Sequence, residues 1–217
     1  MIEINKYIDH TLLKATATEA DIMELCKEAR ENEFFSVCVN SCYVKLAAKN
    51  LAGSEVKVCT VVGFPLGAMS TEAKVFEAEQ ALKDGAEEVD MVINIGELKS
   101  KNLEKVENEI SAIKKTIGGK VLKVIIETCY LTPEEIVVAS EIAAKAKADF
   151  VKTSTGFGTD GAKMENIELM KGAVNGMAKI KASGGIKNLD TALSYIEAGV
   201  ERIGTSSGVS ILKELKG

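Results

Sequence analysis

The segment Phe150-Val151-Lys152-Thr153-Ser154-Thr155-Gly156-Phe157-Gly158 begins as a short β-rich run and ends in a loop of hydroxyl side chains and glycine. Because side chains alternate between the two faces of a strand, Val151 and Lys152 point to opposite sides. If Val151 packs beneath a helix, Lys152 faces a barrel interior or a crevice. The segment therefore indicates a buried strand with a lysine at its carboxyl end.

The same arrangement recurs along the chain. Lys179-Ile180-Lys181-Ala182-Ser183-Gly184-Gly185 is another strand that ends in small residues, and Gly204-Thr205-Ser206-Ser207-Gly208 closes a third. Several of the strands are continuously apolar, as strands buried on both faces are. Working outward, we predict eight strands: Tyr7–Thr11, Phe34–Asn40, Val56–Val62, Glu88–Asn94, Val121–Thr128, Asp149–Thr153, Ala178–Ser183 and Val200–Thr205.

Amphipathic stretches with helix-start and helix-end signals separate these strands. Thr132-Pro133-Glu134-Glu135 predicts a capping box with proline at the first helical position, and Thr18-Glu19-Ala20-Asp21 opens another helix. Gly85 and Gly199 follow helical stretches, where a left-handed residue ends a helix. About eight strand-then-helix repeats in 217 residues predict an α/β chain with one domain, residues 1–217, folded as a (β/α)8 TIM barrel.

An open, doubly wound sheet is the alternative architecture, because it shows a similar alternation of strands and helices. No G-x-G-x-x-G follows the first predicted strand, and no linker rich in proline, glycine or serine divides the chain. Proline occurs only at Pro65 and Pro133. These features favour the closed barrel, in which chemistry belongs at the carboxyl ends of the strands.

Composition excludes several classes of partner. The net charge is −5, with both signs interspersed, so no basic patch predicts nucleic-acid binding. No apolar run approaches the roughly 20 residues of a membrane span, and the first residues lack a signal-peptide pattern. We therefore expect a cytoplasmic protein that binds neither nucleic acid nor membrane.

Cysteine and histidine usage bears on redox state and metals. The five cysteines are odd in number and form no C-x-x-C, which predicts buried free thiols in a reducing compartment. The single histidine, His10, disfavours a metal site built from several histidines. We interpret His10 as a hydrogen-bonded structural residue, with a general base as the alternative.

Lys152 and Lys181 together suggest amine chemistry on a carbonyl compound. A free lysine has a pKa of about 10.4, so roughly one amine in 2,500 is neutral at pH 7. Lowering that pKa to about 7 takes roughly 4.6 kcal/mol, and one like charge about 4 Å away supplies around 4 kcal/mol at an effective dielectric constant of 20. A neighbouring Lys181 plus partial burial therefore activates Lys152 as a nucleophile. Alternatively, the Lys152 side chain extends to solvent, and Lys181 is a lysine in a structural salt bridge.

Other charged residues in the strands have different expected roles. Asp90 lies in Glu88-Val89-Asp90-Met91-Val92-Ile93-Asn94, where a carboxylate among apolar neighbours must be paired. It is either a structural ion pair or a partner of the lysines that relays protons. Lys57 and Lys123 lie near strand starts, and Lys179 is expected to reach out of the barrel base in the same way.

Glycine and serine residues at the last two strands predict a phosphate site. In barrels, the loops after strands seven and eight often cradle phosphate with backbone N–H groups and a helix N-terminus. Tight turns also use glycine pairs, so the combination of two such loops carries the argument. The expected binding residues in these two loops are Gly184, Gly185, Gly204, Ser206 and Ser207.

Taken together, the strand-end segments resemble the deoxyribose-phosphate aldolase family, whose members are class I (Schiff-base) aldolases. The matching segments run in the family order over nearly the whole chain. Besides the segments around Asp90, Lys152, Lys181 and Gly204, they are Tyr7-Ile8-Asp9-His10-Thr11, Val37-Cys38-Val39-Asn40 and Val61-Val62-Gly63-Phe64-Pro65-Leu66-Gly67.

The resemblance implies a lyase of deoxyribonucleotide catabolism that reversibly cleaves 2-deoxy-D-ribose 5-phosphate to D-glyceraldehyde 3-phosphate and acetaldehyde. It assigns Lys152 to the imine, Lys181 to charge tuning and proton transfer, and Asp90 to proton transfer. It places Asp9, Cys38 and Thr153 on the pocket wall. It implies no metal and no cofactor, and partners limited to small phosphorylated sugar or aldehyde substrates. It adds the loop after Lys152, with Thr155 and Gly156, to the phosphate site. The oligomeric state stays open at this point, with a homodimer as the working expectation.

Three other functions compete with this interpretation. One is a different Schiff-base enzyme on the same fold, such as a transaldolase. Another is a catalytically silent sugar-phosphate binding protein, although such a module has no reason to bury two like charges. The third is a metal-dependent aldolase, which the single histidine disfavours.

Overall fold

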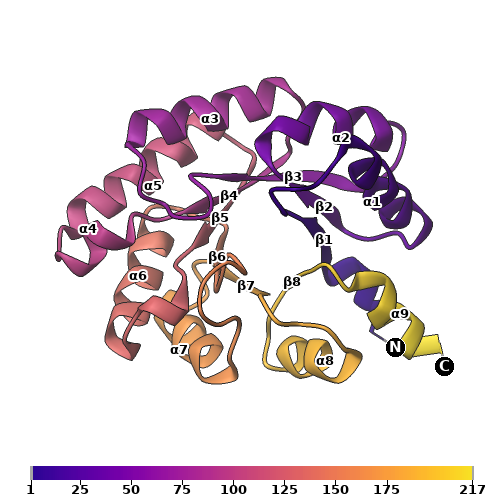
Figure 1. Ribbon diagram of the computed structural model, residues 1–217. Coiled ribbons are helices and arrows are strands. Elements are labelled where there is room, and N and C mark those ends of the chain that lie inside the picture. Colours follow the sequence, from indigo (N-terminus) through magenta and orange to yellow (C-terminus); the bar gives the residue numbers. More distant parts are fainter. Residues whose placement is uncertain (1, 217) are drawn as a thin grey trace.

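The computed structural model describes residues 2–216, in which eight parallel strands close into a barrel with sequential order from β1 to β8 (Figure 1). This confirms the predicted (β/α)8 architecture and excludes the open sheet. The strands are β1 Ile8–Leu12, β2 Ser36–Val39, β3 Lys57–Val62, β4 Glu88–Val92, β5 Val121–Ile125, β6 Phe150–Lys152, β7 Lys179–Ser183 and β8 Arg202–Thr205.

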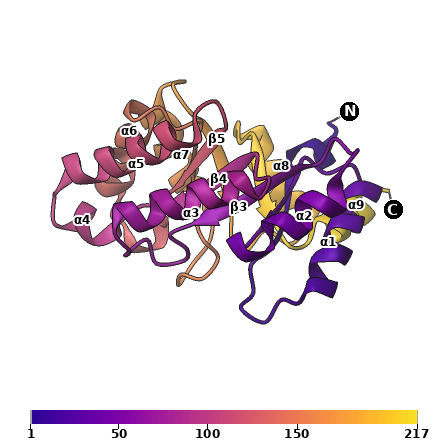
Figure 2. The same cartoon turned by 90° about the horizontal axis from the view of Figure 1, so that it is seen from above.

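Helices surround the barrel and cover the outer face of the strands (Figures 1 and 2). The α-helices in residues 2–216 are α1 Glu19–Glu31, α2 Val44–Leu51, α3 Thr71–Lys83, α4 Ile95–Lys99, α5 Leu103–Ile117, α6 Pro133–Lys145, α7 Met164–Val174, α8 Leu189–Glu197 and α9 Gly208–Lys216. Single 3₁₀ turns form η1 Ile4–Tyr7, η2 Ser41–Tyr43 and η3 Thr128–Tyr130. In the described part of the chain, no helix is both long enough and apolar enough to cross a membrane.

The helix starts and ends predicted from the sequence are present in the structure. Thr18 with Asp21, and Thr132 with Glu135, form reciprocal capping boxes at the starts of α1 and α6. Gly85 and Gly199 have φ of 109° and 92° after α3 and α8, a backbone region open to glycine.

All eight predicted strands exist, and four of them, β2, β4, β5 and β6, are shorter than predicted at their carboxyl ends. The prediction Val121–Thr128 ends at Ile125, and Asp149–Thr153 ends at Lys152. Glu127 takes a left-handed backbone, with φ of 54°, which breaks the extended run before η3. The residues beyond the strand ends therefore form the rim loops.

Two different cores result from the alternation of side chains. Between strands and helices, the packing is apolar, and Val89, Met91, Val124 and Ile203 belong to one continuous cluster. The barrel interior instead holds a small apolar cluster around Cys38, alongside buried charges. A barrel interior of this kind positions charged groups rigidly, because every strand contributes to it.

Candidate active site

Asp90 lies at the centre of the barrel interior and binds three lysines. Its Oδ2 accepts hydrogen bonds from Lys152 Nζ and Lys181 Nζ, each at 2.8 Å, and its Oδ1 accepts one from Lys123 Nζ at 2.8 Å. Register explains the convergence, because Asp90 pairs with Lys123 across β4 and β5, and Lys152 pairs with Lys181 across β6 and β7. The nitrogens of Lys152 and Lys181 share one oxygen, so they lie no farther apart than twice 2.8 Å.

The surrounding lysines keep Asp90 ionised. Burial alone would raise the pKa of this carboxyl, but the charges of Lys123, Lys152 and Lys181 hold the pKa of Asp90 well below its ordinary value. Asp90 is fully buried, and it also accepts from Cys59 Sγ at 3.1 Å. The predicted pairing of Asp90 with both strand-end lysines is therefore present in the geometry.

Lys181 is held between two carboxylates. Its Nζ binds Asp9 Oδ2 as well as Asp90 Oδ2, and the side chain is fully buried. Burial opposes its charge, but Asp9 and Asp90 outweigh that effect and raise the pKa of Lys181 above its ordinary value. Lys181 therefore stays an ammonium at neutral pH.

A second layer of charges lies deeper in the barrel. Lys123 Nζ contacts Glu88 Oε2 at 2.6 Å, and Arg202 binds both Glu88 and Asp9. Burial opposes the charge of Arg202, yet the two carboxylates raise its pKa above the ordinary value. The pKa of Lys123 is raised in the same way, against burial, chiefly by Asp90.

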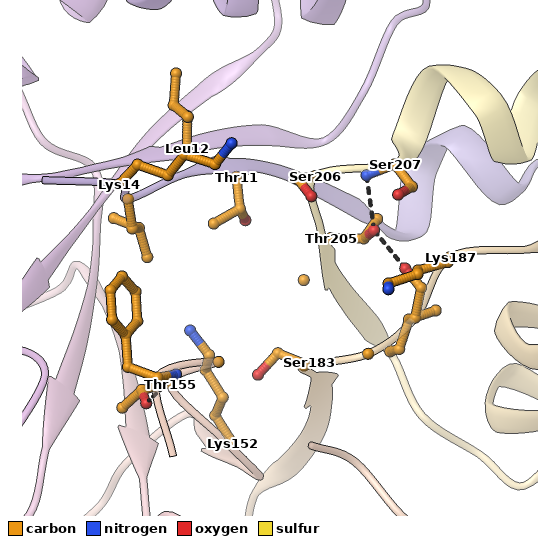
Figure 3. A pocket seen from close by; sticks show the side chains of 17 residues that line it. Thr11, Leu12, Lys14, Lys152, Thr155, Ser183, Lys187, Thr205, Ser206 and Ser207 are labelled. Atoms are coloured by element: carbon orange, nitrogen blue, oxygen red, sulfur yellow. Dashed lines mark hydrogen bonds between the residues drawn. The ribbon is translucent and has the colours of Figure 1, made fainter. Parts of the chain in front are cut away.

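Lys152 is the interior cation that reaches a cavity. Its side chain is 3% exposed and lines a pocket of about 270 Å³ at the carboxyl end of the barrel. Figure 3 shows its amine directed into this pocket, with Thr11 and Ser183 on the opposite and adjacent walls. Lys152 therefore combines access to a small molecule with contact to the buried carboxylate.

The loops predicted to bind phosphate line the same pocket. The lining contains all seven of these residues: Thr155, Gly156, Gly184, Gly185, Gly204, Ser206 and Ser207. Thr205 Oγ1 donates to Ile186 O at 2.6 Å and accepts from Ser207 N at 2.9 Å, which ties the β7 and β8 loops together (Figure 3). Glycine at position 204 also avoids a steric conflict, because a Cβ there would lie 3.1 Å from Lys181 Cε.

The geometry is that of a site for carbonyl chemistry. A lysine amine faces a small cavity, the charged groups around Asp90 lie directly behind the amine, and glycine-containing loops line the same cavity. The arrangement can form an imine and move protons, and the pocket has room for a short phosphorylated chain.

Comparison with known proteins points to the same chemistry. Residues 4–214 match the family described as DeoC/LacD family aldolase. A deoxyribose-phosphate aldolase of Finegoldia magna is 60% identical over 212 residues, which cover 98% of this chain and 100% of the relative. The chain belongs to the DeoC/LacD aldolase family.

Solved structures agree with this assignment. An aldolase named QR15 superposes with a TM-score of 0.96 at 47% identity, covering 100% of this chain and 97% of its own. A structure described as a tetrameric deoxyribose phosphate aldolase from Aeropyrum pernix superposes with a TM-score of 0.92 at 34% identity, covering 99% and 91%. The resemblance seen in the strand-end segments is therefore confirmed at the level of the family.

Three residues expected on the pocket wall of this aldolase lie elsewhere. Asp9, Cys38 and Thr153 are each 0% exposed and are not part of the lining described above. Asp9 lies below the pocket, where it binds Lys181, and Thr153 Oγ1 donates to Ser183 O at 3.0 Å between β6 and β7. Asp9 and Cys38 belong to the packed barrel interior, and Thr153 joins the ends of β6 and β7, so all three support the site without lining it.

The sequence misplaced one lysine of the aldolase barrel. Lys123 was grouped with the strand-base lysines, but it is fully buried and contacts Asp90. Lys57 and Lys179 do lie at the base, where they pair with Glu87 and Glu201. Lys123 is the third residue of β5, with Leu122 and Val124 on either side, which is the same signal that singled out Asp90.

Further residues of the site went unnoticed in the sequence. Lys14 and Lys187 line the pocket and bring positive charge to it, whereas Glu88 and Arg202 complete the interior charges. Glu88 and Arg202 lie two residues before Asp90 and Gly204 on the same strands, so each shares the inward face of its strand. This spacing would have identified both residues from the sequence.

His10 has the structural environment that we expected. Its Nε2 lies 2.7 Å from Glu28 Oε2, and its ring packs against Phe34 with centroids 5.0 Å apart. The cysteines are all free, but only Cys26, Cys38 and Cys59 are buried. Cys42 is exposed and Cys129 is partly exposed, so the expectation of uniformly buried thiols was wrong.

Proposed function

We propose that this chain is a class I deoxyribose-phosphate aldolase, which reversibly cleaves 2-deoxy-D-ribose 5-phosphate to D-glyceraldehyde 3-phosphate and acetaldehyde through an imine on Lys152. One observation carries the proposal. Of the four cations that the structure places in the barrel interior, Lys152 alone lines the pocket and alone contacts a single carboxylate.

The balance of charges in the barrel interior supports a reaction in which Lys152 acts as the neutral amine. Asp9, Glu88 and Asp90 supply three negative charges, whereas Lys123, Lys152, Lys181 and Arg202 supply four positive charges when all are protonated. Each of the other three cations is held by at least two carboxylates. A neutral Lys152 leaves equal numbers of opposite charges, and a neutral amine is the nucleophile that imine formation needs.

The reaction follows from the positions of these groups. The Lys152 amine adds to the aldehyde carbon of the open-chain sugar, and loss of water gives a protonated imine. The C3 hydroxyl passes its proton to the Asp90–Lys181 relay, the C2–C3 bond breaks, and its electron pair moves into the imine to form an enamine. C3 becomes the aldehyde carbon of D-glyceraldehyde 3-phosphate, which leaves. Protonation of that enamine and hydrolysis release acetaldehyde.

Asp90 and Lys181 move the protons in these steps. Asp90 Oδ2 is 2.8 Å from the amines of both lysines, so a proton has a path between Lys152 and Lys181 through one oxygen. Lys181 donates a proton to the departing hydroxyl during imine formation, and the proton that the attacking water loses during hydrolysis returns to Lys181 through Asp90. Lys181 also keeps a positive charge beside Lys152, which favours its neutral form.

The phosphate binds at the end of the pocket opposite the aldehyde carbon. The loops around Gly184-Gly185 and Ser206-Ser207 line the cavity, and α8 and α9 begin just after these loops, where helix N-termini favour anions. Lys187 adds a positive charge on the same wall, as Figure 3 shows. A phosphorylated substrate is therefore preferred over the free sugar.

Steady-state kinetics with a set of substrates tests this function. We expect cleavage of 2-deoxyribose 5-phosphate, a lower kcat/KM for 2-deoxyribose, and loss of turnover in Lys152→Met and Lys181→Met. Lys179→Met is the matched control, because Lys179 lies two residues before Lys181 on β7 but is exposed. Transfer of a three-carbon ketose unit would instead support a transaldolase, and tight binding without turnover would support a binding protein.

We further propose that the chain acts in the cytoplasm, in deoxyribonucleotide catabolism, as a homodimer. The reaction consumes a sugar phosphate, which is an intracellular metabolite. Large apolar side chains such as Leu66, Phe76 and Met177 are exposed on the single chain and are suited to contacts between copies. Light scattering coupled to size exclusion measures the mass, and a monomer or a tetramer would contradict the dimer.

A further inference from the structure

Arg202 and Glu88 form a buried pair at the base of the barrel. Arg202 Nη1 donates to Glu88 Oε1 at 3.1 Å and Nη2 donates to Glu88 Oε2 at 2.6 Å, a bidentate arrangement. Arg202 Nε donates to Asp9 Oδ1 at 2.8 Å. The guanidinium carbon lies 3.5 Å from the centroid of the Phe35 ring, so the group is fixed from every side.

Two short chains of contacts connect this pair with Lys152. One passes from Arg202 through Asp9 and Lys181 to Asp90. The other passes from Glu88 through Lys123 to the opposite oxygen of Asp90. Neither Arg202 nor Glu88 lines the pocket, so neither touches a substrate bound there.

The pair therefore acts on Lys152 through charge and position. The titratable groups that face the interior are three carboxylates (Asp9, Glu88, Asp90), four cations (Lys123, Lys152, Lys181, Arg202) and two thiols (Cys38, Cys59). Adding or removing one buried charge changes how strongly the barrel interior favours the protonated form of Lys152, because solvent does not screen buried charges.

We propose that Arg202 and Glu88 are a positioning pair that sets the protonation state of Lys152 from the base of the barrel. The inference rests on the proposed function, in which a neutral Lys152 attacks the aldehyde. Arg202 disfavours the ammonium form of Lys152 by its own charge and by engaging Asp9. Glu88 favours the ammonium form, and its charge cancels that of Arg202.

The two halves of the pair predict opposite changes. Glu88→Gln removes a negative charge, so the acidic limb of the pH profile of kcat/KM should move to lower pH, on the order of one pH unit. Arg202→Met removes a positive charge and should move the limb to higher pH by a similar amount. The double variant loses both charges and should return the limb close to its original position.

Two further variants separate charge from structure. Arg202→Lys keeps the charge but loses the planar fork, so the limb should stay in place even if turnover falls. Glu201→Gln is the matched control, because Glu201 precedes Arg202 but lies exposed, paired with Lys179. It should leave both turnover and the limb unchanged.

The experiment records kcat/KM against pH and the rate of borohydride trapping with acetaldehyde at the same pH values, with circular dichroism as the check on folding. Opposite shifts that cancel in the double variant support the proposal. Unmoved limbs, or shifts in the same direction, overturn it. If Arg202→Met does not fold, Glu88→Gln and the double variant still test the proposal. The acidic limb must move to lower pH in Glu88→Gln and return close to its original pH in the double variant. Absence of trapping in the unsubstituted chain at every pH would reject the proposed function itself.

Discussion

At the scale of single residues, Asp90 is the group on which the interior depends. Its two oxygens accept hydrogen bonds from three lysine Nζ atoms on β5, β6 and β7, each at 2.8 Å. An isolated carboxylate at this depth would be protonated or would destabilise the fold. Here the same contacts keep Asp90 charged and hold Lys152 and Lys181 beside each other.

Replacing Asp90 with asparagine should therefore lower both activity and stability. The amide fills the same space but no longer neutralises the ammonium groups, so we expect kcat to fall by at least about 100-fold. The free energy of unfolding should fall by about 3–5 kcal/mol, since buried cations lose their partner. Steady-state kinetics and urea unfolding measure the two effects.

Asp190→Asn provides the control for this substitution, because Asp190 is exposed on α8. It should change stability by less than about 1 kcal/mol and leave kcat as it was. Native-like turnover in Asp90→Asn would show that Asp90 has only a structural role.

Sequence reasoning at this scale found the residues with two independent signals. Lys152 and Lys181 stand at strand ends beside small-residue loops, and Asp90 interrupts an apolar strand. Lys123 only interrupts an apolar strand and is not followed by a loop of small residues. Its place near the predicted start of the strand therefore suggested a position at the barrel base. The distances that join the four groups come from the stagger of strands around the barrel, which one strand's sequence does not contain.

At the scale of elements, the loop after β6 is held by a residue from the loop after β5. Glu127 is 2% exposed, its Oε1 accepts from Thr155 N at 3.1 Å, and its Oε2 accepts from the Thr155 hydroxyl. Thr155 Oγ1 in turn accepts from Phe157 N at 3.0 Å. The left-handed backbone of Glu127 aims its carboxylate at this loop, which forms one wall of the pocket.

Glu127→Gln should loosen that wall of the pocket. The amide keeps one acceptor for Thr155 N–H but loses the charge-assisted bond to the hydroxyl, which is worth about 1.5–3 kcal/mol. We expect KM for the phosphorylated substrate to rise roughly tenfold, with a smaller change in kcat, as steady-state kinetics would show. Glu141→Gln, on the exposed face of α6, is the control. If both variants keep the KM of the unsubstituted chain, the proposed role of Glu127 is contradicted.

A second buried pair joins α3 and α5 to the end of β4. Lys74 Nζ contacts Glu109 Oε2 at 2.8 Å and donates to Val92 O at 2.8 Å, and Glu109 Oε2 accepts from Asn94 N at 3.3 Å. Burial lowers the pKa of Lys74 and raises the pKa of Glu109, so the pair is retained against a desolvation cost. Its contacts fix the strand that carries Asp90.

Lys74→Met should reduce the free energy of unfolding by about 3–5 kcal/mol, because Glu109 keeps a buried charge without its cation. The double variant Lys74→Met with Glu109→Leu should recover most of that loss, since an apolar pair avoids the desolvation cost. Urea unfolding followed by circular dichroism measures both. A single variant as stable as the unsubstituted chain would contradict the interpretation of this pair.

The elements were predictable in kind and order but not at their ends. Capping boxes and glycine stops mark helix boundaries chemically, so those predictions were right at Thr18, Thr132, Gly85 and Gly199. The carboxyl ends of strands carry no such mark. After β5, Ile126 and Thr128 are as buried as strand residues, so the sequence pattern continues although the backbone turns at Glu127.

At the scale of the whole molecule, the buried carboxylates govern the response to acid. Burial would raise the pKa values of Asp9 and Asp90, but their cationic neighbours lower both pKa values below those of the unfolded chain. A lowered pKa in the folded state contributes stability that is present above the unfolded value, about 3.9 for aspartate, and is lost as pH falls below it.

The free energy of unfolding should therefore fall steeply as pH decreases below about 4, with the contribution of these two groups intact above that value. Urea unfolding at a series of pH values between 7 and 2 measures this dependence. A loss that is complete above pH 5 would mean that Asp9 and Asp90 are not ionised and paired in the folded barrel.

The barrel as a whole was predictable, because eight repeats of strand and helix allow few arrangements of this length. The charged interior was not, since the inward faces of eight strands combine residues that are up to 193 positions apart, as Asp9 and Arg202 are. The sequence marks each charge singly, and only the closed sheet shows that seven of them form one network.

Chemical trapping of the imine tests the central claim most directly. The protein is incubated with 2-deoxyribose 5-phosphate, reduced with borohydride, digested and mapped by mass spectrometry. We expect a reduced adduct on Lys152 that is absent in Lys152→Met and present in Lys179→Met. An adduct on Lys181 or Lys123 with Lys152 unmodified, or no adduct in the folded protein, would contradict it.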